Sequence, residues 1–239
     1  MSLAHPAFDP YRALIAALDL AHGPPPIARL DALSGQLGCV NARGLPVRFV
    51  ASERPLSARD YETGIFDTGT VPTRAGNWHD VFNALVWLRF PATKAAINAA
   101  HVAALPGSDG ARRGPRRDAL TVLDESGVVV TAGDAALTAL LAARQWHTLF
   151  WERRAQVAAT LHAIVIGHAL LEKALDPYPA MTGKCLVIDG TAHDETIAAH
   201  IGDIRSPAQL LPLPVQGLPG WDAANSHPGY YANREVFRP

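Results

Sequence analysis

The sequence predicts a helix-rich α+β fold in a single domain with a few short strands. Apolar residues make up 49% and charged residues 18% of the 239 residues, a composition typical of a globular chain that buries a core. Apolar side chains recur at helical spacing in most segments, and only short stretches alternate as strands do. Because the chain shows neither internal repeats nor a long linker, we expect residues 1–239 to form one domain.

The first half of the chain is predicted to contain helices, one strand and one loop. Asp9 and Pro10 are typical of a helix start, Gly38 of a helix end, and Pro91 of a break between two helices. In chain order we expect helices at 10–22 and 27–37, a strand at 46–50, an extended loop at 61–74, and helices at 77–89 and 92–104.

The second half is predicted to mix strands and helices before an irregular end. The alternation around Glu125 and Gly127 is typical of a β-hairpin, and Asp134 is suited to cap a helix. In chain order we expect a β-hairpin at 119–131, helices at 135–144 and 146–175, a strand at 185–189, a helix at 195–201, and an ordered, aromatic-rich C-terminal arm at 210–239.

Charge and cysteine content favour a cytoplasmic protein without a membrane partner. The formal net charge of −1 gives no overall attraction to nucleic acid or anionic membranes, although a local patch could still bind an anionic small molecule or nucleic acid. Cys39 and Cys185 are far apart and suit a reducing compartment. No signal-peptide pattern opens the sequence, and no apolar run is long enough to span a bilayer.

Residues 73–101 combine polar and aromatic side chains at unusual density. The polar members are His79, Asp80, Asn83, Lys94, Asn98 and His101. Helical spacing puts His79 and Asn83 on one face of the first predicted helix, and Lys94, Asn98 and His101 on one face of the second. A turn at Pro91 would bring the two faces together, with Asp80 near them. Imidazole, carboxylate and amide groups can bind a divalent metal or orient a general base. The alternative is a structural seam that satisfies helix ends and loop carbonyls.

An arginine cluster follows this stretch. Arg112, Arg113, Arg116 and Arg117 lie within six residues, separated by Gly and Pro. Guanidinium groups bind phosphate or carboxylate in a planar, bidentate geometry, which predicts an anion-binding loop. The alternative is a solvated surface loop.

His168 and Glu172 form a third candidate cluster. They are one helical turn apart in an otherwise apolar segment, where ionisable groups require a partner. We expect them to act as metal ligands or as an acid/base pair. The alternative is a buried network of His, Glu and Arg.

Five sequence blocks carry a resemblance to a known family. They are NWHDVFNALVWLRFPATKAAINAAH, RGPRRDALTVLDESG, HTLFWERR, GHALLEK and the closing VFRP. From about residue 61 to the end the chain resembles a bacterial family of unknown function, domain-of-unknown-function family 3025. The resemblance implies no activity and no catalytic residues.

A second resemblance is confined to the central stretch. The succession of His79-Asp80, Asn83, Asn98 and His101 is similar to the second half of the HNH (His-Me finger) nucleases. That similarity implies His79 as general base, Asn98 or His101 beside a single divalent ion, and arginines on the phosphate. The sequence departs from the pattern because the His–Asp order is reversed and His79 is predicted to lie in a helix.

Two functions from different classes are compatible with these observations. The first is a metal-assisted hydrolase of a phosphate-bearing substrate, including a nuclease-like phosphodiesterase, with one divalent metal ion as cofactor. The second is a non-catalytic binding or scaffold protein with a buried His/Asn/Glu network and an Arg-rich docking loop. In the first, the catalytic residues would be His79, Asp80, Asn98 and His101, the substrate-binding residues Asn83, Lys94, Arg113, Arg116 and Arg117, and the metal ligands His79, His101, His168 and Glu172.

Overall fold

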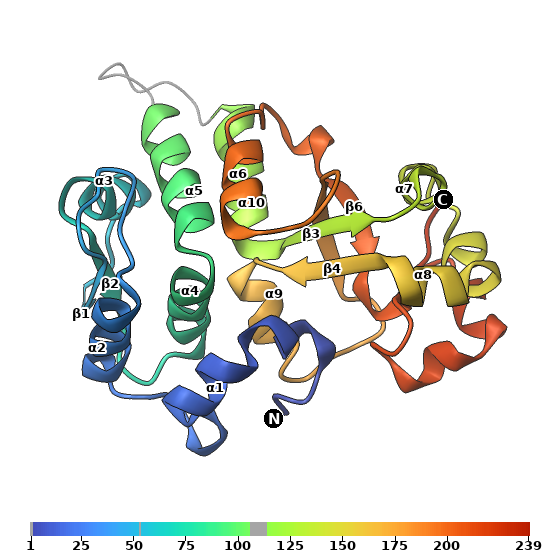
Figure 1. The fold of residues 1–239 in the computed structure, drawn as a ribbon, viewed down its shortest axis with the longest axis horizontal. Coiled ribbons are helices and arrows are strands. Elements are labelled where there is room, and N and C mark those ends of the chain that lie inside the picture. The colour runs from blue at the N-terminus through green and yellow to red at the C-terminus, as the bar shows by residue number, and fades with distance from the viewer. Residues whose placement is uncertain (1, 53, 106–113) are drawn as a thin grey trace.

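Helices dominate the structure, a computed structural model that describes residues 2–52, 54–105 and 114–239 (Figure 1). Helices account for 55% of the chain and strands for 14%, which confirms the predicted helix-rich α+β class. The α-helices are α1 (Arg12–Leu18), α2 (Ile27–Leu37), α3 (Ala58–Thr68), α4 (Trp78–Arg89), α5 (Pro91–Ala103), α6 (Pro115–Ser126), α7 (Ala135–Ala142), α8 (Arg154–Thr160), α9 (His168–Lys173) and α10 (Asp194–Ile201).

The strands form two separate sheets. They are β1 (Arg48–Ala51), β2 (Thr70–Thr73), β3 (Gly127–Ala132), β4 (Leu161–Val165), β5 (Thr182–Val187) and β6 (Leu211–Pro214). β1 and β2 pair in parallel. The other four have the order β4-β3-β5-β6, in which β3 runs antiparallel to β4 and parallel to β5, and β5 runs antiparallel to β6.

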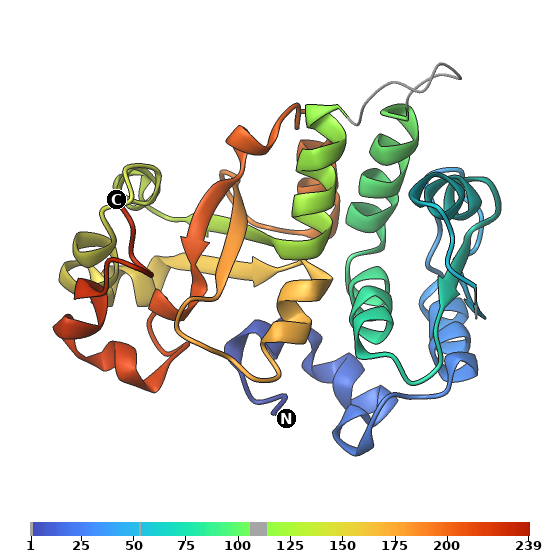
Figure 2. The ribbon, with the colours of Figure 1, turned by 180° about the vertical axis from the view of Figure 1, so that it is seen from behind.

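The helices that separate the two sheets carry most of the polar residues of the predicted clusters. The β1–β2 pair lies with α2 and α3 at one end of the molecule, and the four-stranded sheet lies toward the other (Figures 1 and 2). Between them stand α4 and α5, with α6, α9 and α10 beside them. One cluster of buried apolar side chains includes residues from all of these elements, from Ala7 to Phe237.

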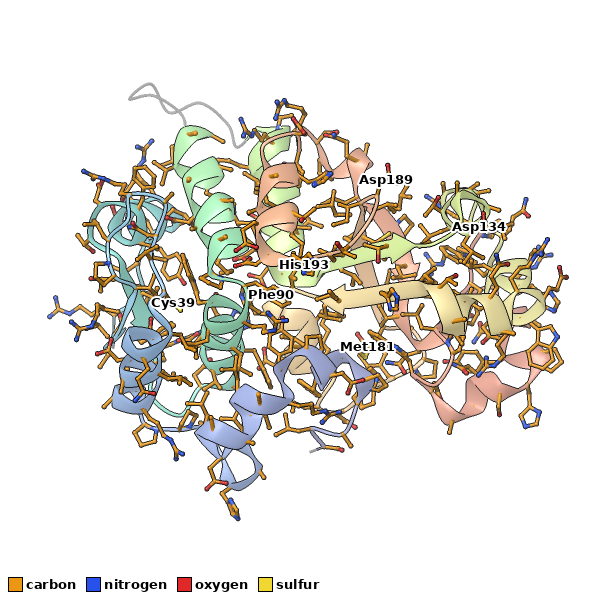
Figure 3. The ribbon with its side chains drawn as sticks, viewed as in Figure 1. Cys39, Phe90, Asp134, Met181, Asp189 and His193 are labelled. Carbon is orange, nitrogen blue, oxygen red and sulfur yellow. The ribbon has the colours of Figure 1, made fainter. Side chains whose placement is uncertain are left out.

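The central pair of helices follows the sequence prediction closely. Asn77 caps α4 by accepting a hydrogen bond from the backbone N–H of Asp80 (3.0 Å). Buried Phe90 ends α4 (Figure 3), and Pro91 occupies the first position of α5, where its missing N–H costs nothing. Gly38 likewise ends α2 in the left-handed conformation (φ 65°), as predicted.

The predicted β-hairpin at 119–131 is wrong. Its first half is the end of α6, and only the second half is a strand, β3, whose partners lie far along the chain. Pro115 starts α6, and the buried Ala119, Leu120 and Leu123 are spaced to lie on one face of that helix. The apolar residues of this stretch therefore fit both the alternation of a strand and the spacing of a helix, and packing in the folded protein favours the helix.

Two further expectations also fail. The loop expected at 61–74 is helix α3 followed by β2, because Ser57 caps the helix by accepting from the backbone N–H of Asp60 (3.1 Å). The long helix expected at 146–175 is divided into α8, β4 and α9. β4 pairs with β3 here, so tertiary pairing outweighs the local helical pattern.

The C-terminal arm and the helix lengths complete the description. Tyr231 and Phe237 in the arm are buried, and Trp146 Nε1 donates to the carbonyl of Arg238 (2.7 Å). Across the described ranges, every helix is either too short or too polar to cross a membrane.

A close backbone contact joins the end of α6 to the start of α9. The backbone N–H groups of Ile166 and Gly167 both donate to the carbonyl of Gly127 (3.0 and 2.9 Å). A Cβ atom at position 167 would lie 2.3 Å from Gly127 N and 2.6 Å from Ser126 Cα. Only glycine fits at position 167, and its absence of a side chain lets His168 approach the last turn of α6.

We predict that Gly167→Ala lowers the free energy of unfolding by about 1–3 kcal/mol or more, because the added methyl group overlaps backbone atoms. Urea denaturation of the purified variant would measure the loss. Gly35→Ala in α2 is the matched control, because a Cβ there meets no atom within 4 Å. The control should be neutral or gain about 0.5–1 kcal/mol. Equal effects at the two positions would contradict the close contact.

Candidate functional site

A cavity of about 500 Å³ lies where α3, α4, α5, α6 and α9 meet. Its rim includes the segment around Arg54, Pro55 and Leu56. The acidic, imidazole and amide groups in its lining are Glu62, His79, Asp80, Asn83, His101, Asp124, Glu125 and His168. The cavity thus contains residues from each helix of the predicted cluster and also acidic residues that the sequence did not single out.

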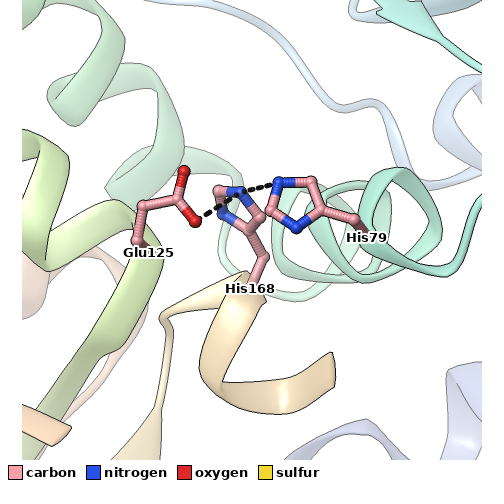
Figure 4. A group of neighbouring side chains, drawn as sticks. All are labelled: His79, Glu125 and His168. Carbon is pink, nitrogen blue, oxygen red and sulfur yellow. Dashed lines mark hydrogen bonds and ion pairs between the residues drawn. The ribbon is translucent and has the colours of Figure 1, made fainter. Parts of the chain in front are cut away.

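Three side chains in the cavity converge closely enough to share one cation (Figure 4). His79 Nε2 and His168 Nε2 are 3.1 Å apart, and Glu125 Oε2 is 3.6 Å from His168 Nε2. His79 lies in the first turn of α4, Glu125 in the last turn of α6, and His168 at the start of α9. Two nitrogens bound tetrahedrally to zinc at 2.0–2.1 Å would be about 3.3 Å apart, close to the spacing observed here.

Each of the two imidazoles has a carboxylate beside its other ring nitrogen. His79 Nδ1 lies 3.1 Å from Glu172 Oε2, a hydrogen-bonding distance. His168 Nδ1 lies 3.8 Å from Asp124 Oδ2, close enough for electrostatic attraction. A carboxylate favours the proton on the nitrogen that faces it. In that tautomer each Nε2 offers a lone pair to a cation between the rings, whereas a proton on either Nε2 lets the two atoms form a hydrogen bond at 3.1 Å.

His168 is kept neutral by its surroundings. Its side chain is only 7% exposed, and burial lowers its pKa to about 4 although Asp124 acts in the opposite direction. A neutral imidazole is the form that binds a metal. Glu125 is more open, with 41% of its side chain exposed, and burial together with nearby Asp124 raises its pKa above the usual value even though His79 opposes the shift.

Lys94, predicted to bind substrate, pairs with a carboxylate of the protein. It is buried and donates to Asp124 Oδ1, so its charge is neutralised within the protein. Burial alone would raise the pKa of Asp124, but the charges of Lys94 and His168 outweigh it and lower the pKa to about 2. Lys94 therefore holds Asp124 ionised beside His168, and it does not line the cavity.

Asp80 is likewise engaged by the protein. Arg74 donates to Asp80 Oδ1 from Nη2 (2.7 Å) and to Oδ2 from its backbone N–H (2.6 Å). Burial would raise the pKa of Asp80, but these bonds from Arg74 outweigh it and lower the pKa. This ion pair fixes the entry into α4 and with it the position of His79.

Glu62 is a cavity residue that the sequence prediction missed. Asn98 Nδ2 donates both to the Glu62 carbonyl (2.9 Å) and to Glu62 Oε2 (2.7 Å). Burial, opposed by the Asn98 hydrogen bond, raises the pKa of Glu62 to about 7. The signal that could have found it is Ser57-x-x-Asp60, a helix start that places Glu62 in the first turns of α3.

Two further predicted residues face the cavity. Asn83 Nδ2 donates to the hydroxyl of Tyr61 (3.0 Å), while its buried Oδ1 has no partner within the described parts of the chain. His101 also lines the cavity, near the end of α5.

Arg116 and Arg117, the predicted anion-binding arginines that the structure describes, do not line the cavity. Arg112 and Arg113 lie outside the described residues, and Arg116 and Arg117 sit in the first turn of α6 without lining the cavity. The guanidinium groups of its lining instead come from two residues that the sequence prediction did not select, Arg54 and Arg74.

Glu172, a predicted metal ligand, lies beside the converging trio of His79, Glu125 and His168. Its Oε2 is 3.1 Å from His79 Nδ1, the ring nitrogen that faces away from His168. His101, the other predicted ligand, also stands outside the trio.

The chain belongs to the family described as "protein of unknown function (DUF3025)", which matches residues 47–239. No curated protein and no solved structure is significantly similar to it. The structure gives no support to the resemblance with HNH nucleases. His79 lies in helix α4, and the amide of Asn98 is engaged by Glu62.

We predict that Glu62→Gln changes the pH dependence of stability. A carboxyl whose folded pKa is raised to about 7 contributes stability that is present below its unfolded pKa of 4.5 and is lost as pH rises through 7. The variant should therefore gain stability over the wild type between about pH 5 and about pH 8, by on the order of 3 kcal/mol at most. Urea denaturation at both pH values would measure it, with Glu235→Gln, an exposed glutamate, as the unaffected control.

Proposed function

We propose that this protein is a metal-assisted hydrolase that binds one divalent cation through His79, Glu125 and His168. The observation that carries the proposal is the pair of Nε2 atoms facing each other at 3.1 Å, each imidazole with a carboxylate at its Nδ1. In metal sites, such carboxylates orient the ligand histidines and increase their basicity. Two imidazoles and one carboxylate suit zinc, iron or manganese, and three protein ligands leave a position for water.

The surrounding residues support a hydrolytic role for such a site. A divalent ion lowers the pKa of a bound water to about 7 and so provides a nucleophile at neutral pH. Glu172 and Asp124 hold the two imidazoles, and Lys94 keeps Asp124 ionised. Asp80 and Asn98 support the cavity walls through Arg74 and Glu62, while Asn83 and His101 face its interior.

We propose a phosphate-bearing substrate, of which a phosphodiester is the first to test. Arg54 lines the same cavity as the proposed cation site, and Arg74 lines it while paired with Asp80. Guanidinium groups and a divalent cation are the usual combination for charge stabilisation at a transferring phosphoryl group. An anionic small molecule or a nucleic-acid end would supply that chemistry.

The metal proposal predicts that His79→Ala and His168→Ala each weaken zinc or manganese binding by more than about 100-fold, because each removes one ligand. Glu172→Gln should weaken binding by about 10–100-fold, because it removes the group that orients His79. Isothermal titration with each metal on purified apo-protein would measure these changes. His22→Ala is the control, since the His22 side chain is 82% exposed and pairs only with Asp19 in the described structure.

Metal-loaded protein should also hydrolyse bis(p-nitrophenyl) phosphate, and the two histidine variants should not. The proposal would be contradicted if the wild-type protein bound neither zinc nor manganese and the two histidine variants lost only stability. That outcome would instead favour the non-catalytic scaffold, in which the same groups form a buried hydrogen-bond network.

A further inference from the structure

Glu62 stands apart from the two ion-paired carboxylates of the cavity, Asp80 and Asp124, and from Glu125, which lies 3.6 Å from His168 in the proposed cation site. Asp80 is bound by Arg74, and Asp124 is bound by Lys94. The partner that the structure gives the Glu62 carboxylate is the neutral amide of Asn98. A neutral amide orients a carboxyl group without supplying the charge that would hold it ionised.

The position of Glu62 is fixed from two sides. It belongs to the second turn of α3, and Asn98 on α5 donates to both its backbone carbonyl and its side chain. The two hydrogen bonds from the Asn98 amide restrict the rotamers of the Glu62 side chain, so that the carboxyl group faces the cavity in a defined direction. It lines the same cavity as His79 and His168 but on a different helix.

The charges around Glu62 oppose one another. Asp124 disfavours the ionised form, whereas Lys94 and Arg117 favour it. Lys94 and Asp124 pair with each other, so their effects on Glu62 largely cancel. Burial then decides the balance in favour of the protonated acid near neutral pH.

We infer that Glu62 is the general acid that protonates the leaving group of a phosphodiester held in this cavity, an inference that rests on the proposed hydrolase function. The oxygen of a water molecule bonds to phosphorus while the bond from phosphorus to the leaving oxygen breaks. The proton of Glu62 passes to that leaving oxygen and yields an alcohol, and the proton lost by the water restores the Glu62 acid.

Asn98 is the positioning residue for this acid. Because its amide donates to Glu62 Oε2, it helps to direct the proton-bearing oxygen toward the cavity. Asn98→Asp would replace a neutral donor with a negative charge and keep Glu62 protonated to higher pH, which would move the pH profile without removing the acid.

The test compares two leaving groups on zinc- or manganese-loaded protein. Bis(p-nitrophenyl) phosphate releases a stable anion that needs no proton, whereas the dinucleotide thymidylyl-thymidine releases a sugar alkoxide that does. Glu62→Gln should lose about 10²–10⁴-fold in rate on the dinucleotide and less than about tenfold on the nitrophenyl ester. The wild-type rate on the dinucleotide should fall as pH rises through about 7, and the variant should lack that dependence.

Two results would distinguish failure of the acid role of Glu62 from failure of the hydrolase proposal. Equal losses on both esters, or no loss on either, would overturn the acid role of Glu62 and leave the metal-assisted hydrolase standing. Absence of hydrolysis of both esters by metal-loaded wild type would overturn the phosphodiesterase and the acid role together. Glu235→Gln serves as the matched glutamate control, and unchanged zinc affinity of Glu62→Gln would show that the cation site is intact.

Discussion

The candidate site depends on the backbone contact between Gly127 and Gly167. Two hydrogen bonds to the Gly127 carbonyl join the end of α6 to the start of α9, and neither backbone could approach so closely with a Cβ at position 167. Asp124 and Glu125 precede the first glycine, and His168 follows the second. The contact therefore brings two carboxylates and an imidazole together from segments that are distant in the sequence.

The carboxylates of the cavity have different partners, and these partners set their charges. Lys94 and Arg74 neutralise Asp124 and Asp80, and these pairs hold the histidines and the start of α4 in place. Glu62 has an amide partner, and burial raises its pKa to about 7. The carboxylates of the cavity thus differ in pKa according to what lies beside them.

The sequence predicted the helices with clear start and end signals and the general location of the polar cluster. α2, α4 and α5 matched because Gly38, Asn77 and Pro91 act locally. Glu125 was missed because its segment alternates like a strand while it also fits a helical period, and Glu62 was missed because nearby glycines suggested a loop. Long-range contacts such as the one between Gly127 and Gly167 leave no local sequence pattern. The sequence could suggest that His79 and His168 share a pocket, but the distance between their Nε2 atoms could not be predicted from it.

The arginines show that composition alone does not place a side chain in a cavity. Four guanidiniums in six residues predict anion binding, yet Arg116 and Arg117 belong to α6 and lie outside the cavity lining. Arg54 and Arg74 reach the lining because the chain around β1 and β2 forms the opposite wall. Arg54 and Arg74 therefore reach the proposed substrate position from the segments that follow β1 and β2, with Arg74 in its ion pair with Asp80, while the proposed cation ligands come from α4, α6 and α9. A substrate bound between the two would contact both the segments that follow the β1–β2 pair and the helices that carry the proposed ligands.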